Sequence, residues 1–173
     1  MPDARRAAVS DTALSAPSFV EFYRSTRDNV GRALALSLGD AELAAEAVDE
    51  AMARAYARWS KIGAYDNAGG WVYRVALNWA TSVRHRRRRQ PVPPVDRGAT
   101  DVAAASEPAV VAALLQLDVR HRAVIVCRYY LGLSEAETAA ALGVRPGTVK
   151  SRAHRATRRL QIDLAHLDPS EQQ

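Results

Sequence analysis

The most informative residue spacing lies near the C-terminal end of the chain. Ser134 and Glu137 form a capping box, in which the serine hydroxyl accepts a hydrogen bond from the amide three residues on. Gly143 suits the left-handed conformation that closes a helix, and Pro146 suits the first position of the next helix. The sequence therefore predicts two helices joined by a tight turn, the arrangement of a DNA-binding helix-turn-helix.

The second of these helices, expected over residues 147–160, carries outward side chains that suit DNA. Lysine and arginine pair with phosphates and guanine edges, and shorter polar side chains add hydrogen bonds. An ordinary helical hairpin with a basic surface is the alternative. We favour DNA binding because the turn chemistry and the basic face agree. The expected duplex-DNA contacts are Arg145, Thr148, Lys150, Ser151, Arg152, His154 and Arg155.

A second basic block ends a helix expected over residues 71–89. Five of the six residues 84–89 are arginines, more than a helix C-terminus needs to complement its dipole. Their mutual repulsion costs stability unless a polyanion neutralises it, which favours nucleic-acid contact. Aromatic side chains on the same helix, Trp71, Tyr73 and Trp79, with Asn78 among them, suit stacking on single-stranded bases.

A third cluster is acidic and lies on a helix expected over residues 41–59. One face of this helix is apolar, with Val48, Met52, Ala55, Tyr56 and Trp59 at helical spacing. Another face carries Glu42, Glu46, Asp49 and Glu50. On spacing alone we favour a solvated face, and docking on a basic partner is the alternative.

The elements that must position these clusters are helices. The chain has 173 residues, a net charge of +5 and an alanine-rich composition that favours helix. Residues 90–106 contain three prolines and one glycine and predict a linker. We expect an all-α fold of two small helical domains, residues 19–89 and 107–167, joined by a flexible linker, with the helix-turn-helix in the second domain. Residues 1–18 and 168–173 are expected to be tails.

Several function classes are disfavoured by composition. The single cysteine, Cys127, excludes an internal disulfide and predicts a buried, inert thiol. The scattered histidines offer no metal-ligand spacing, and we expect neither a metal nor a cofactor. No apolar run is long enough for a signal peptide or a membrane span, so we expect a cytoplasmic protein without membrane contact.

Both halves of the chain resemble a known family. The stretch YYLGLSEAETAAALGVRPGTVKSRAHRATRRL (129–160) resembles the upstream-promoter-reading domain of sigma-70-type factors, and residues 19–89 resemble their promoter-melting domain. Within residues 19–89, the stretch EAVDEAMARAY (46–56) is similar to the helix of that domain that docks on the polymerase. The stretch WVYRVALNWATSVRHRRRR (71–89) is similar to the helix that captures the melted strand. The domain order and the short linker resemble the extracytoplasmic-function (ECF, group 4) sigma factors.

The resemblance implies a transcription initiation factor and no catalytic residues. It implies reading of the −35 element as duplex and capture of the melted −10 element. The residues it implies for capture are Tyr65, Trp71, Arg74, Asn78, Arg84, Arg86 and Arg87. Those it implies for docking on core RNA polymerase are Glu46, Asp49, Glu50 and Met52. This implication replaces the interpretation, made from spacing alone, that the acidic face is only solvated. Expected partners are core RNA polymerase, promoter DNA (duplex and single-stranded) and an anti-sigma factor. We expect the protein to be a monomer when no partner is bound.

The sequence disfavours two other functions. A stand-alone transcription regulator would pair the helix-turn-helix with a ligand-binding or phosphoacceptor domain, and residues 19–89 show no such features. An enzyme, such as a nuclease or recombinase, would need clustered carboxylates for metals or a nucleophile beside a base. The acids of residues 42–50 have no histidine partner, so we expect no enzyme.

Overall fold

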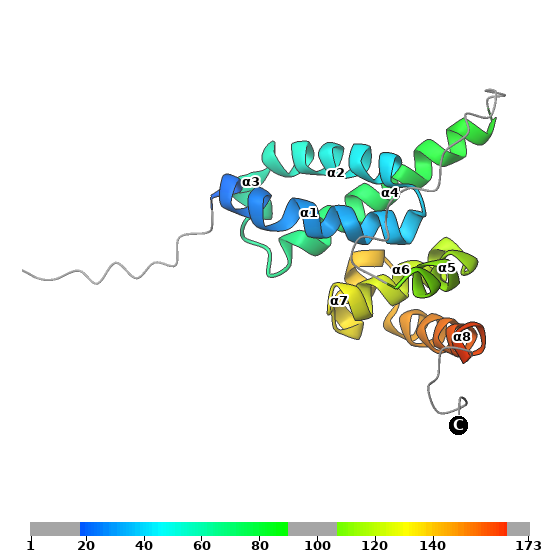
Figure 1. The fold of residues 1–173 in the computed structure, drawn as a ribbon. Coiled ribbons are helices and arrows are strands. Elements are labelled where there is room, and N and C mark those ends of the chain that lie inside the picture. The colour runs from blue at the N-terminus through cyan, green and yellow to red at the C-terminus, as the bar shows by residue number, and fades with distance from the viewer. Residues whose placement is uncertain (1–17, 90–106, 166–173) are drawn as a thin grey trace, which may run out of the picture.

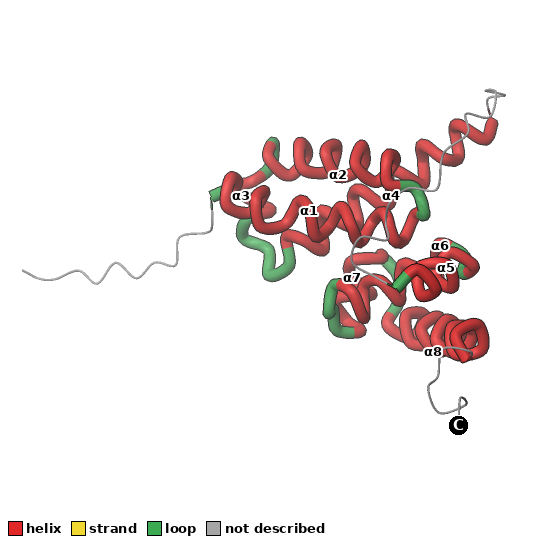
Figure 2. The backbone as a smooth tube through the Cα atoms, viewed as in Figure 1, coloured by secondary structure: helices red, strands yellow, loops and turns green. Residues whose placement is uncertain are grey.

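The computed structural model describes residues 18–89 and 107–165, which fold into two groups of helices packed against one another (Figure 1). The first group comprises α1 (Phe19–Leu38), α2 (Ala41–Tyr56), α3 (Trp59–Ile62) and α4 (Ala68–Arg89). The second comprises α5 (Pro108–Gln116), α6 (Val119–Ile125), the π-helix η2 (Val126–Tyr130), α7 (Glu135–Leu142) and α8 (Pro146–Leu164). The described residues contain no strand (Figure 2), which confirms the all-α fold class.

A tight turn folds α1 and α2 into a hairpin. Gly39, at φ 64°, ends α1 in the left-handed conformation, and the Asp40 carboxylate accepts from the Leu43 amide at 2.9 Å to begin α2. A Cβ atom on Gly39 would lie 2.7 Å from a methyl group of Leu115, so a larger residue would clash there. The helix α4 packs against this hairpin, and the buried centre of the group includes Leu34, Leu43, Val48, Val72 and Tyr73.

The end of α2 differs from the expected boundary. The helix was expected to continue to Trp59, but it ends at Tyr56, and Trp59 begins the short helix α3. The indole ring of Trp59 packs on Phe22 and Phe19, with centroids 4.7 Å and 5.4 Å apart. Tyr56, the last residue of α2, belongs to the apolar stripe but is 68% exposed. The packing of the Trp59 ring against α1 therefore ends α2 at Tyr56, although the apolar residues at helical spacing continue to Trp59.

The start of α4 also differs. The helix was expected from Trp71, and it begins at Ala68. The Asn67 side chain explains the extra turn, because its Oδ1 accepts from the Gly70 amide at 2.6 Å, as an N-cap does. A Cβ atom on Gly70 would lie 2.9 Å from the Asn67 amide group. Glycine thus allows the cap to close over the first turn.

The two groups share one buried core. Leu114, Leu117 and Ile125 of the second group belong to the same cluster as the centre of the first. The buried Tyr73 hydroxyl lies 2.7 Å from the Ser37 hydroxyl and is also hydrogen-bonded to the Cys127 thiol of the second group. Cys127 is buried, as predicted, and burial raises its pKa to about 12, which disfavours the reactive thiolate.

A buried arginine weakens this junction. Arg122 donates from Nη2 to the carbonyl oxygens of Leu117 at 2.8 Å and Leu115 at 3.3 Å, while its Nε has no hydrogen-bond partner. Burial, and then the charge of Arg84, lowers the Arg122 pKa. Because a buried cation without a paired carboxylate costs free energy, the two groups are held less firmly than an all-apolar core would hold them.

The linker of residues 90–106 and the expected tails lie outside the described residues, except for Ser18, whose side chain caps the start of α1. Within residues 18–89 and 107–165, no helix has the length and apolar content to cross a membrane. The same residues contain no group of three histidine, cysteine or acidic side chains placed to hold a metal ion.

Candidate nucleic-acid interface

The predicted helix-turn-helix is present in α7 and α8. The Ser134 hydroxyl accepts from the Glu137 amide at 3.2 Å, and the Glu137 carboxylate accepts from the Ser134 amide at 2.7 Å, which completes the capping box. Gly143 ends α7 with φ 65°, and Pro146 is the first residue of α8. These four residues carry out the roles that their spacing predicted.

A small apolar cluster fixes the angle between the two helices. Val149 of α8 is 1% exposed and packs with Val124 of α6 and Ala139 of α7. Leu142 and Val144 pack against this cluster from the turn. The helix α8 is therefore anchored along one face and presents the opposite face outward.

We predict that Ser134→Ala destabilises the protein by about 0.5–2 kcal/mol, because it leaves amides at the start of α7 without their cap. The measurement is urea unfolding followed by circular dichroism. Ser151→Ala is the matched control, since the Ser151 hydroxyl only donates to the Thr148 carbonyl at 3.1 Å within α8. Equal stability of the two variants would contradict the role of the cap.

The outward face of α8 carries basic side chains, most of which pair with no carboxylate of the described residues. Arg159 pairs with Asp163 at 2.9 Å, but Arg145, Lys150, His154 and Arg155 form no ion pair within the described residues. Arg145 stands at the N-cap position without a side-chain cap bond, so its guanidinium is available to a ligand. Of the seven side chains expected to contact duplex DNA, five are exposed, and Thr148 and Arg152 are half-buried.

The residues expected to capture a single strand are divided between two roles. Arg74, Asn78 and Arg86 are exposed on α4, and Tyr65 is 40% exposed in the loop before it. Trp71 is half-buried and packs on the core. The other two arginines of this set make contacts within the protein. Arg84 donates to the Leu38 carbonyl at 2.6 Å, and Arg87 pairs with Glu46 at 3.3 Å.

The acidic face of α2 is paired with arginines. Arg27 donates to the Asp49 carboxylate from Nε at 3.1 Å and from Nη2 at 2.8 Å, and this hydrogen bonding raises the Arg27 pKa. Arg54 pairs with Glu50 at 2.7 Å. Met52, by contrast, is only 2% exposed. Its side chain packs in the core, so it cannot contact a partner directly, and we correct the expectation that it does.

The start of α4 lies against α7. Arg74 donates to the Ala140 carbonyl at 3.4 Å, and its guanidinium lies beside Gly143. Tyr65, Trp71 and Arg74 line a cavity of about 210 Å³ whose opposite wall includes Glu137, Ala140 and Ala141 of α7. The helix-turn-helix therefore covers part of the face expected to hold a melted strand.

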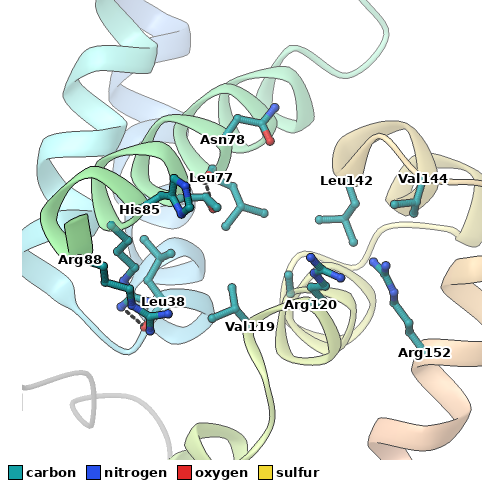
Figure 3. A pocket seen from close by; sticks show the side chains of 13 residues that line it. Leu38, Leu77, Asn78, His85, Arg88, Val119, Arg120, Leu142, Val144 and Arg152 are labelled. Atoms are coloured by element: carbon teal, nitrogen blue, oxygen red, sulfur yellow. Dashed lines mark hydrogen bonds between the residues drawn. The ribbon is translucent and has the colours of Figure 1, made fainter.

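A larger cavity, of about 430 Å³, lies further along α4. Asn78 of α4 and Arg152 of α8 both line it, although they were expected to read different DNA elements (Figure 3). The two expected DNA-reading surfaces thus meet at one junction.

Comparison with known proteins agrees with this geometry. The family model described as sigma-70, region 4 matches residues 108–160. The RNA polymerase sigma-E factor of Streptomyces coelicolor is 34% identical over 155 residues, covering 87% of this chain and 88% of that protein. The ECF RNA polymerase sigma factor SigL of Mycobacterium tuberculosis is 39% identical over 139 residues, covering 75% of this chain and 78% of that protein. The chain belongs to the ECF family of RNA polymerase sigma factors.

The fold of the factor is also found in a solved structure. The sigma factor RpoE from Bartonella quintana, crystallised in complex with the anti-sigma factor NepR, superposes with a TM-score of 0.69. The match covers 85% of this chain and 96% of that chain at 22% sequence identity. At that identity the match shows the all-helical fold of the factor.

Sequence reasoning missed a contact within the first helix group and the residues that meet between the two groups. Arg27 was not expected to bind Asp49, and Arg120, His85 and Arg88 were not expected to share a cavity. These residues come from separate helices, and no local spacing connects them. The charge on Arg27 was visible in the sequence of the factor, but its partner depends on how α1 packs on α2.

Proposed function

We propose that the factor binds core RNA polymerase and directs promoter-specific initiation by reading the −35 element as duplex and capturing the melted −10 element. The observation that carries this proposal is the helix-turn-helix whose second helix presents unpaired cations outward. Family membership supports the role in initiation.

Upstream reading is assigned to α8. Its N-terminal turns carry Thr148, Lys150, Ser151 and Arg152, and in a helix-turn-helix this end of the second helix approaches base edges in the major groove. Arginine is the side chain best suited to bidentate contact with guanine, so Arg152 is the proposed base reader. Lys150, Arg145 and Arg155 are proposed to bind phosphates and set the register.

Downstream capture is assigned to α4 and the loop before it. Tyr65 and Trp71 offer aromatic faces for unstacked bases, and such stacking is worth about 1–3 kcal/mol per base. Asn78 is exposed on the same face of α4, about two helical turns after Trp71, and offers an amide to a base edge. Arg74 and Arg86 are proposed to hold the phosphates of the strand.

The acidic face of α2 is proposed to dock on core RNA polymerase. Glu46, Asp49 and Glu50 lie on one face of the helix, each beside an arginine of the factor. Exposed ion pairs of this kind are worth only about 0.2–1 kcal/mol, so a basic partner surface can displace them. An anti-sigma factor is a further proposed partner, as in the complex of RpoE with NepR.

Promoter engagement requires the two helix groups to separate. Arg74 contacts α7, and Asn78 and Arg152 line one cavity, so neither DNA element can bind fully in the packed arrangement. The seventeen residues 90–106, fully extended, span at most about 55–60 Å, which is enough for two separate promoter elements. The buried Arg122 lowers the free energy needed to part the groups.

The test of capture uses Asn78→Ala in holoenzyme reconstituted on an ECF promoter. Losing one hydrogen bond worth about 0.5–1.5 kcal/mol lowers strand opening by about two- to tenfold. The measurement is permanganate reactivity of unpaired thymines in the downstream element. Ser82→Ala is the matched control, because the Ser82 hydroxyl is occupied by the Asn78 carbonyl at 2.9 Å. Unchanged reactivity in Asn78→Ala would remove this residue from the capture site.

A further inference from the structure

The cavity of about 430 Å³ between the helix groups is lined by apolar side chains, which we call its floor, and by arginines, which we call its cationic rim. Its apolar lining is Leu38, Leu77, Val119, Ala123, Leu142 and Val144. Its cationic lining is Arg84, Arg88, Arg120 and Arg152, and His85 lies among them. Figure 3 shows His85 and Arg88 on the α4 side and Arg120 and Arg152 on the opposite side.

The charges on the rim are not balanced from within the described residues. No acidic side chain lines the cavity. Arg84 is held by the Leu38 carbonyl and lies 3.9 Å from Asp40, but Arg88, Arg120 and Arg152 form no ion pair there. Packing the two groups together therefore gathers like charges around one space. An anion placed among them would remove this repulsion and bind both groups at once.

The size and lining define the class of anion. A volume of about 430 Å³ falls in the range of small-molecule sites. An α-helix of a partner, about 10–12 Å across with its side chains, is too wide for it. Six apolar side chains suit a flat ring, the amide of Asn78 can pair with a base edge, and the arginines suit phosphate oxygens.

We propose that this cavity binds a nucleoside polyphosphate, and that the bound nucleotide holds the two helix groups together. The base lies on the apolar floor beside Leu77, Leu142 and Asn78, and the phosphates reach Arg88, Arg120 and Arg152. The nucleotide thereby competes with promoter DNA for Asn78 and Arg152. This last consequence rests on the proposed function, whereas binding and locking do not.

The rate at which the single thiol of the factor is labelled shows whether a bound nucleotide holds the two helix groups together, which we call locking. Cys127 is fully buried at the junction, so a reagent reaches it only when the groups part. N-ethylmaleimide is the reagent of choice because it is uncharged and is not attracted to the cationic rim. A ligand that binds only the packed arrangement lowers the open population, and at 100 times its Kd the labelling rate falls by about 100-fold.

The experiment measures labelling of the full chain at constant ionic strength with ATP or GTP as probes. Tripolyphosphate, which has the charge without a base, is the comparison ligand. Arg120→Gln removes one rim cation outside the proposed DNA-reading residues, and Arg24→Gln removes an exposed cation of α1 as the matched control. Calorimetric titration with the same probes measures binding independently.

We expect a nucleotide to slow labelling in the unmodified chain and in Arg24→Gln, with at least about tenfold weaker affinity in Arg120→Gln. Tripolyphosphate should bind more weakly than the nucleotides. Failure of both nucleotides to bind, equal binding by tripolyphosphate, or equal affinity in the two variants would overturn the site. Binding without slower labelling would overturn the locking role. Because no DNA or polymerase is present, these outcomes are independent of the proposed function.

Discussion

Replacing Asp49 with arginine is expected to abolish assembly of the factor with core RNA polymerase while leaving the helices folded. Asp49 is exposed on α2, and the substitution places a cation where a basic partner surface is proposed to dock. Like charges brought together across an interface cost several kcal/mol, which is enough to prevent assembly. The measurement is binding of labelled factor to core polymerase, with circular dichroism to confirm folding.

Arg27→Gln is the matched control for this variant. It breaks the same ion pair, which joins Arg27 and Asp49 at 2.8 Å, but it leaves the carboxylate in place. We expect the control to assemble normally and to lose at most about 1 kcal/mol of stability, as for other exposed pairs. If folded Asp49→Arg assembles normally, this residue is not part of the docking face. If neither variant assembles with core polymerase, assembly depends on the ion pair between Arg27 and Asp49 and not on the carboxylate alone.

Replacing Arg152 with alanine is expected to weaken recognition of the upstream element by about 1–3 kcal/mol, or roughly 5- to 150-fold. The reason is loss of a guanidinium in the N-terminal part of α8, which is proposed to approach base edges. The effect should be largest on the preferred promoter and small on unrelated DNA. The measurement is competition binding of holoenzyme to promoters that differ at single upstream positions.

Arg158→Ala removes an equal charge further along α8 and serves as the comparison. We expect it to weaken binding uniformly across sequences and to reduce the salt dependence, without changing the preferred base. An unchanged upstream footprint and unchanged base preference in Arg152→Ala would exclude Arg152 from base reading. A loss of preference in Arg158→Ala instead would move the reading surface toward the C-terminal half of α8.

The helix-turn-helix could be predicted because its determinants are local. Ser134 and Glu137 satisfy each other within one helical turn, and Gly143 and Pro146 act through their own backbone preferences. None of these effects depends on a distant partner. The all-α class followed for the same reason, from helix propensity and the absence of strand-like alternation.

Helix ends and burial were harder to predict because they depend on packing. Trp59 leaves α2 to pack on Phe22, and helical spacing cannot show that. Met52 has the spacing of the apolar face of α2, and only the family resemblance implied a contact with a partner; the side chain is buried at 2% exposure. Spacing identifies which side chains share a face, but the neighbouring helix decides which face is covered.

The junction between the helix groups could not be predicted at all. Tyr73, Ser37 and Cys127 are far apart in the chain, and the hydrogen bond between Tyr73 and Cys127 exists only where the two groups pack together. The buried Arg122 runs against the usual preference of arginine for the surface, so composition argued against it. The cavity and its cationic rim follow from this same junction.

The central claim is tested most directly by transcription with purified core RNA polymerase on fragmented genomic DNA, with and without the factor. We expect discrete new start sites that appear only with the factor, share an upstream sequence and disappear with Asp49→Arg. The contradictory result is a folded factor that yields no new start sites but binds specific duplex DNA tightly without polymerase.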